Sequence, residues 1–98
     1  MDTLNLLTII ADESLASFIE AEITDLGAKG YTISPVSGKS QNHVRDNPWE
    51  GENIKIETIV SESNCSKILN HLQQKYFNRY AMIVFHHPVH VVRTHHFL

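Results

Sequence analysis

The residues best suited to chemistry lie in a polar segment between two apolar runs, Ser37 to Glu52. Gly38 lets a backbone approach an anion closely, and Lys39 and Arg45 offer charge-assisted hydrogen bonds to phosphate or carboxylate. Residues 38–40 read GKS, but the upstream glycine of a nucleotide-binding P-loop is missing and no helix is predicted to follow. The segment therefore suits anion binding without being a P-loop. A polar loop that binds nothing is the alternative interpretation.

The same segment contains the only tryptophan of the chain, Trp49, between Pro48 and Glu50. Loops longer than about 12 to 15 residues are uncommon in compact domains and are usually functional or disordered. Tryptophan and arginine are enriched where protein partners dock. We therefore expect Trp49 to contact a partner protein.

A second group of chemically capable residues is the set of histidines after residue 85: His86, His87, His90, His95 and His96. Imidazole is the commonest metal ligand, so zinc, copper or nickel binding is one interpretation. On a strand, however, His86 and His87 would point to opposite faces, and His86 and His90 would stand roughly 13 Å apart. Pro88 excludes a helical pair. Separate surface histidines are the favoured interpretation, and a metal site is the alternative.

The remaining candidates favour structure over catalysis. Cys65 and His71 lie six residues apart on a predicted helix, which does not align them as a catalytic pair, so Cys65 is expected in the core. Glu20 and Glu22 are expected on a solvated helix face. Nucleophile-elbow, HExxH and triad motifs are absent from the sequence, so an enzyme is disfavoured.

Hydrophobic periodicity predicts the elements that must position these residues. Strands are predicted over 3–11, 31–36, 53–60 and 80–85, helices over 12–27 and 61–77, and a short fifth strand over 89–93 after Pro88. The order is βαββαβ, the α+β ferredoxin-like arrangement, with an antiparallel sheet and two helices on one face. The first and fourth strands are apolar on both sides, so we expect association through the second face of the sheet.

Details of the two helices are also predicted. Asp12 is the cap candidate for the first helix, and Ser61, Ser63 and Asn64 are the candidates for the second. The apolar stripe of the first helix comprises Leu15, Phe18, Ile19, Ile23 and Leu26. Gly27 and Gly30 are expected to end that helix.

Composition sets the broad class. The 98 residues are 42% hydrophobic and 19% charged, which fits one globular domain over 1–98. A net charge of −3 provides no general attraction to nucleic acid. The N-terminal apolar run is too short for a membrane span, and one cysteine fits a reducing compartment, so a cytoplasmic protein without membrane insertion is expected. No covalently bound cofactor is indicated.

Four segments together resemble the PII signalling superfamily, in order and over nearly the whole chain. They are GAKGYT (27–32), VSGK (36–39), NIKIETIV (53–60) and IVFHHPVHVVRT (83–94). The GxxGYT motif, the HVR step at 43–45, KYF at 75–77 and the terminal RTHHF are most similar to the SbtB-type PII-like regulators of bicarbonate transport and to carboxysome-associated PII proteins.

This resemblance implies a homotrimer whose sheets pack around a threefold axis and which binds adenine nucleotides in clefts between subunits. It makes residues 37–52 the T-loop, which docks on a membrane transporter or enzyme, and 89–98 a C-terminal tail. Thr32 corresponds to the threonine near the adenine, Gly38 to the glycine at the loop base and Arg93 to a phosphate-contacting arginine. Arg45 corresponds to the second loop arginine of the SbtB type, and Lys39 adds positive charge for the effector.

Departures from the family pattern narrow the range of expected ligands. Asn42 replaces the first loop arginine, Met82 stands where SbtB-type proteins have glycine, and Val91 replaces a second C-terminal arginine. The glycine-rich B-loop of the nitrogen-sensing branch is missing. These departures favour AMP, ADP, cyclic AMP or bicarbonate over ATP with magnesium.

The leading hypothesis is a regulator that senses such an effector by ordering residues 37–52 and then engages a partner, such as a bicarbonate transporter, at the inner membrane face. The first alternative is a trimeric metal-responsive protein similar to CutA, using the five C-terminal histidines. The second is an assembly module that binds no small ligand.

Overall fold

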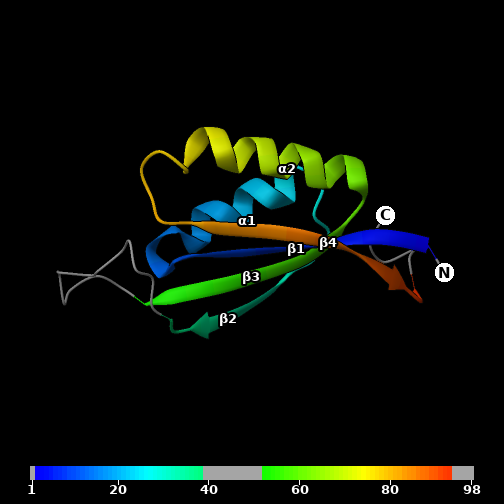
Figure 1. Ribbon diagram of the computed structural model, residues 1–98, viewed down its shortest axis with the longest axis horizontal. Helices are drawn as coiled ribbons and strands as arrows, with labels where there is room; N and C mark the ends of the chain where they lie inside the picture. Colours follow the sequence, from blue (N-terminus) through cyan, green and yellow to red (C-terminus); the bar gives the residue numbers. More distant parts are fainter. Residues whose placement is uncertain (1, 39–51, 94–98) are drawn as a thin grey trace.

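The computed structural model describes residues 2–38 and 52–93 of the chain. A four-stranded antiparallel sheet in the order β2-β3-β1-β4 carries both helices on one face (Figure 1). This arrangement confirms the predicted ferredoxin-like fold. The strands are β1 (Asp2–Asp12), β2 (Thr32–Val36), β3 (Asn53–Val60) and β4 (Ile83–Val91); the helical elements are the 3-10 turn η1 (Glu13–Leu15), α1 (Ala16–Asp25) and α2 (Glu62–Lys75).

Local side-chain chemistry sets the ends of the helical elements. Asp12 caps η1, because its Oδ1 accepts a hydrogen bond from the Ser14 N–H at 2.9 Å. Ser61 caps α2, with its Oγ accepting from the Asn64 N–H at 3.2 Å. After α1, Gly27 adopts a φ of 109°, a conformation that suits glycine.

The core lies between the helices and one face of the sheet. Because β1 and β3 pair antiparallel, Leu7 lies opposite Thr58 and Ile9 opposite Ile56, and these side chains share the face that the helices cover. Alternate residues of β3 are buried, as its sequence pattern predicted. From the helices, the fully buried residues include Ile19, Ile23, Cys65, Ile68 and Leu72.

The outer face of the sheet, which carries no helix, divides into a polar and an apolar half. On the β2 and β3 side it presents Lys55 and Glu57, which form an ion pair at 3.7 Å. On the β1 and β4 side, Ile83 lies opposite Ile10. Ile83 and Phe85 are 56% and 47% exposed, so an apolar surface lies open in the single chain.

The predicted break in the last strand is wrong. Instead of separate strands over 80–85 and 89–93, β4 runs continuously from Ile83 to Val91 and pairs with β1 throughout, with Pro88 opposite Asn5. Pro88 is tolerated because β4 is an edge strand, where a missing N–H need not interrupt a ladder on both sides.

The apolar stripe predicted for the first helix is wrong at one position. Leu15, Ile19 and Ile23 are buried, but Phe18 is 59% exposed. The buried residues Leu15, Ile19 and Ile23 repeat every four positions, and Phe18 lies about 100° around the helix from Ile19, outside this row.

Candidate functional site

Within one chain, the expected ligand-binding residues Gly38 and Arg93 do not lie close together. Gly38 lies two residues beyond β2, at the end of the sheet where Val36, Asn53 and Asp12 are cross-strand partners. Arg93 lies two residues beyond β4, at the other end, where Val91 pairs with Asp2. The intervening strand β1 has eleven residues, which corresponds to about 33 Å at the rise of an extended strand.

Thr32 and Gly38 are exposed and lie along the β2 edge. Thr32 begins β2 and pairs with Glu57, and Gly38 follows the end of the same strand. A Cβ added at Gly38 would meet no heavy atom within 4 Å, so space is open beside its backbone. The other predicted site residues, Lys39, Arg45, Trp49, His95 and His96, lie outside the described residues.

The described histidines do not converge on a metal site. The β1–β4 register places His86 opposite Leu7 and His87 opposite Leu6, so neighbouring histidines face opposite sides of the sheet, as predicted. His86 Nδ1 lies 3.1 Å from Asn5 Oδ1, and His90 Nδ1 lies 3.4 Å from Thr3 Oγ1. Within residues 2–38 and 52–93, no three His, Cys, Asp or Glu side chains are grouped to hold an ion.

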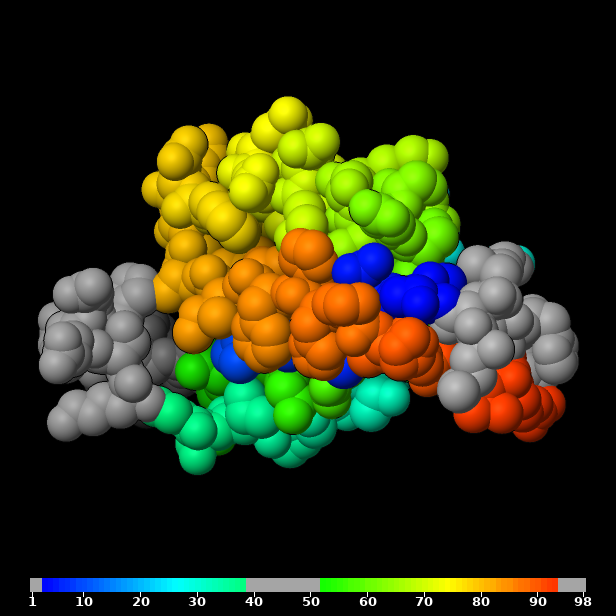
Figure 2. Space-filling model, turned by 45° about the vertical axis from the view of Figure 1, so that its right-hand side comes forward, coloured from blue at the N-terminus to red at the C-terminus, as the bar shows by residue number. Residues whose placement is uncertain are grey.

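A groove of about 360 Å³ lies between α2 and the strands β1 and β4. Figure 2 shows this side of the molecule, with α2 lying along β4 and the start of β1 between them. Thr3, Ser66 and His86 supply polar groups to its wall, and Leu69 supplies an apolar one. Because it lies beside the start of β1, the groove is remote from Gly38.

The end of the sheet near Gly38 also receives the connection from α2 to β4. This connection comprises residues 76–82, and it enters β4 at Ile83, which pairs with Ile10 near the end of β1. Met82, the residue that replaces the family glycine, packs against the core. The connection and the base of the 37–52 segment therefore share one end of the sheet (Figure 1).

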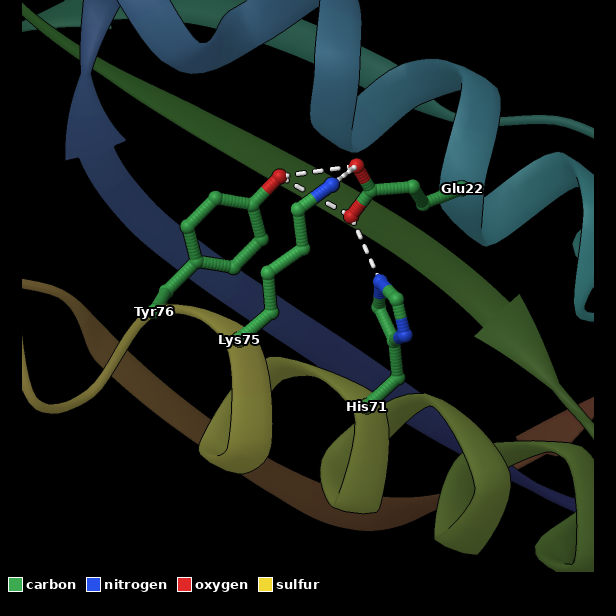
Figure 3. A network of polar contacts seen from close by, with 4 residues as sticks. All are labelled: Glu22, His71, Lys75 and Tyr76. Carbon is green, nitrogen blue, oxygen red and sulfur yellow. Dashed lines mark hydrogen bonds and ion pairs between the residues drawn. The ribbon is translucent and has the colours of Figure 1, made fainter.

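A polar network that the sequence analysis missed anchors the start of this connection (Figure 3). The Glu22 carboxylate of α1 accepts hydrogen bonds from Lys75 Nζ at 2.6 Å and from Tyr76 Oη at 2.9 Å, and lies 2.6 Å from His71 Nε2. The expectation of a solvated Glu22 is wrong, because its side chain is only 16% exposed. A signal was present in the sequence: Glu22 directly precedes core residue Ile23, and His71 and Lys75 are spaced four apart.

The network changes the acid–base properties of its members. Burial acts to raise the pKa of Glu22, but hydrogen bonds from Lys75, His71 and Tyr76 and the charge of Lys75 outweigh it, so the pKa is lowered. Burial and the Glu22 hydrogen bond both raise the pKa of Tyr76. Glu22 therefore remains a carboxylate, and Tyr76 a hydrogen-bond donor, at neutral pH.

Cys65 is a core residue, as predicted. It is buried, and burial, with a further contribution from Glu62, raises the pKa of its thiol. A thiol with a raised pKa is a poor nucleophile at neutral pH.

No helix of the described residues is long and apolar enough to cross a membrane.

Comparison with known proteins identifies the group to which this architecture belongs. The family model for nitrogen regulatory protein P-II matches residues 4–96. A PII-like signalling protein from Thermus thermophilus is 44% identical, with all of both chains covered and a TM-score of 0.86. CPII from Thiomonas intermedia, solved with ADP and bicarbonate, is 27% identical over 99% of this chain and 96% of its own, with a TM-score of 0.86.

CPII has also been solved with ADP, AMP and acetate, at 28% identity over 97% of this chain and 94% of its own and a TM-score of 0.85. The resemblance inferred from sequence motifs, the fold and the near-complete family match agree. The chain belongs to the P-II family of nitrogen regulatory proteins and is a PII-like regulatory protein.

Proposed function

We propose that this regulator binds an adenine nucleotide, AMP, ADP or cyclic AMP, or a small anion such as bicarbonate, in clefts between three copies of the chain. The placement of Gly38 and Arg93 at opposite ends of one sheet carries the proposal. In a cyclic assembly, a neighbouring copy can present its Arg93 to the Gly38 end of the first. Each cleft then combines residues from two chains.

The chemistry of these residues suits a phosphate or bicarbonate ligand. Arg93 offers a guanidinium for charge-assisted hydrogen bonds, and the open space beside Gly38 admits close approach of an anion. Lys39 and Arg45 would add positive charge, and Thr32 would contact the adenine. The ADP, AMP and bicarbonate complexes of CPII support this choice of ligands.

The proposed output is regulation of a protein partner, such as a bicarbonate or other membrane transporter, through residues 37–52. The protein would be cytoplasmic and recruited to the inner membrane face by that partner. Trp49 would contact the partner, and ligand binding would change the conformation of its segment.

Because Trp49 is the only tryptophan, its fluorescence should change when ADP is added. An unchanged emission spectrum under saturating ADP would contradict the coupling.

Isothermal titration calorimetry with AMP, ADP, cyclic AMP and bicarbonate tests the ligand directly. Arg93→Ala should weaken binding of the nucleotide by about tenfold or more, since hydrogen bonds to charged groups contribute roughly 1.5 to 3 kcal/mol. Lys67→Ala removes an exposed cation from α2 and should leave the affinity unchanged. Absence of heat with all four ligands would contradict the proposed function.

A further inference from the structure

The carboxylate of Glu22 joins α1 to the last turn of α2. Besides its bonds to His71 and Lys75, both of its oxygens lie 2.9 Å from the Tyr76 hydroxyl. Figure 3 shows that all three α2-side residues point toward this one acidic side chain. Hydrogen bonds to a charged group are stronger than neutral ones, so Glu22 holds the end of α2 in a defined position.

Tyr76 in turn organises the connection that follows α2. Its backbone carbonyl accepts the N–H groups of Arg79 at 3.0 Å and Tyr80 at 2.9 Å. Its ring packs edge-on against that of Tyr80, with 5.9 Å between the ring centres. Tyr76 is only 3% exposed, whereas the residues that follow it up to Ala81 are exposed. The buried Tyr76 therefore anchors the connection, and its own hydroxyl donates a hydrogen bond to Glu22.

The connection leads to the end of the sheet that bears Gly38. It enters β4 at Ile83, opposite Ile10, and Asp12 at the end of β1 is linked through Asn53 to Val36. Val36 lies two residues before Gly38. The strands β1 and β3 lie between β4 and β2, so cross-strand pairing through them is the route by which a shift of the connection would reach the base of the 37–52 segment.

We propose that Glu22 is a positioning residue: by holding Tyr76, it fixes the 76–82 connection where it enters β4, at the same end of the sheet as Gly38. The consequence for ligand affinity rests on the proposed function, because it requires the ligand to bind at that end. The effect on the connection itself does not depend on any ligand.

Glu20 provides a matched control on the same helix. It also accepts a hydrogen bond from a tyrosine hydroxyl, that of Tyr31, at 2.6 Å. Tyr31 precedes β2, whereas Tyr76 follows α2, so the Glu20 bond does not hold the connection. Glu20→Ala and Glu22→Ala thus each remove a carboxylate that accepts a hydrogen bond from a tyrosine hydroxyl, but the two tyrosines belong to different segments of the chain.

Hydrogen–deuterium exchange of the ligand-free protein tests the positioning role. Glu22→Ala should speed exchange of the Arg79 and Tyr80 amides by about tenfold, because their bonds to Tyr76 open more often in local fluctuations. The β1 and β3 amides, which exchange through global unfolding, should follow only the loss of unfolding free energy. Glu20→Ala should leave the Arg79 and Tyr80 amides unchanged. Unchanged exchange at Arg79 and Tyr80 in Glu22→Ala, or an equal increase at these two amides in Glu20→Ala, would overturn the proposal.

A second variant tests the route through Tyr76. Tyr76→Phe keeps the ring and the backbone carbonyl but removes the hydroxyl, whose single proton is shared between the two Glu22 oxygens. It should speed exchange at Arg79 and Tyr80 to a similar extent, and the double variant with Glu22→Ala should add little further. Fully additive effects would show that Glu22 acts by another route and would overturn the assignment.

Titration with AMP or ADP separates this inference from the proposed function. If wild type binds and Glu22→Ala binds about three- to tenfold more weakly while Lys67→Ala, an exposed change on α2, does not, the cleft is positioned through Glu22. Equal affinities of wild type and Glu22→Ala would overturn that consequence. If wild type binds neither nucleotide, the proposed function fails for these ligands, while the exchange measurements still decide whether Glu22 positions the connection.

Discussion

At the scale of single residues, two acidic side chains on one helix have different surroundings. Glu20 and Glu22 are separated by one residue and carry the same charge, yet only Glu22 contacts the end of α2. The difference follows from the helical period, which turns successive side chains by about 100° and places Glu22 beside the buried stripe. A carboxylate at that position can be partly buried because hydrogen-bond donors surround it.

The Glu22 network should make stability depend on pH. Because folding lowers the pKa of Glu22 below its ordinary value of 4.5, its stabilisation is fully present above pH 4.5 and is lost as the pH falls through the folded-state pKa. Glu22→Gln should therefore cost roughly 1 to 3 kcal/mol of unfolding free energy at pH 7 and less at pH 3. Urea unfolding at both pH values measures this, and equal losses would contradict it.

Gly27 should be the glycine least tolerant of a side chain among Gly27, Gly30 and Gly38. Its φ is 109°, and an added Cβ would lie 2.3 Å from Asn64 Nδ2. Gly27→Ala should destabilise the protein by about 1 to 3 kcal/mol. Gly30→Ala, where nothing lies within 4 Å of the added carbon, should change stability by less than about 0.5 kcal/mol. Denaturant unfolding of the two variants compares them, and similar losses would contradict the steric argument.

At the scale of elements, α2 precedes the connection that leads to the Gly38 end of the sheet. The N-terminal cap of α2 stabilises this helix. Of three cap candidates in the sequence, Ser61 is the cap. Ser61→Ala should cost about 1 kcal/mol, because the Asn64 N–H loses its partner. Ser63→Ala, in the first turn, should have a much smaller effect. Thermal unfolding distinguishes the two, and equal effects would argue against the cap.

At the scale of the whole molecule, the apolar half of the outer face should hold copies of the chain together. Ile83 and Phe85 lie there, exposed in the single chain. We expect wild type to be a trimer by light scattering, and Phe85→Glu to dissociate it because a buried charge without a partner is costly. Phe18→Glu, at an exposed position on α1, should leave the trimer intact. A monomeric wild type would contradict the proposed clefts.

A mixing experiment tests whether each cleft uses two chains. Arg93→Ala and a Gly38→Trp variant, which fills the open space at the other half of the site, should each bind AMP weakly alone. Trimers formed by refolding the two variants together should regain part of the wild-type sites, because some interfaces then pair an intact Gly38 with an intact Arg93. Calorimetry gives the number of sites, and recovery of none would show that the site lies within one chain.

The sequence by itself determined the order of the elements, the burial of β3 and the family. These depend on local periodicity, on capping chemistry and on motifs that are read along the chain, as Asp12, Ser61 and Gly27 illustrate. The predictions from sequence patterns are wrong for Phe18, Pro88 and Glu22. The environment of each of these residues depends on the residues that lie beside it in space.

Only the tertiary structure decided that β4 is an edge strand able to continue through Pro88 and that Glu22 meets Tyr76, 54 residues away in the chain. It also separated Gly38 from Arg93 by the length of the sheet. Such relations are set by strand register and by the packing of helices on the sheet. Local residue patterns record which face a side chain prefers, but they do not record which distant residue it will meet there.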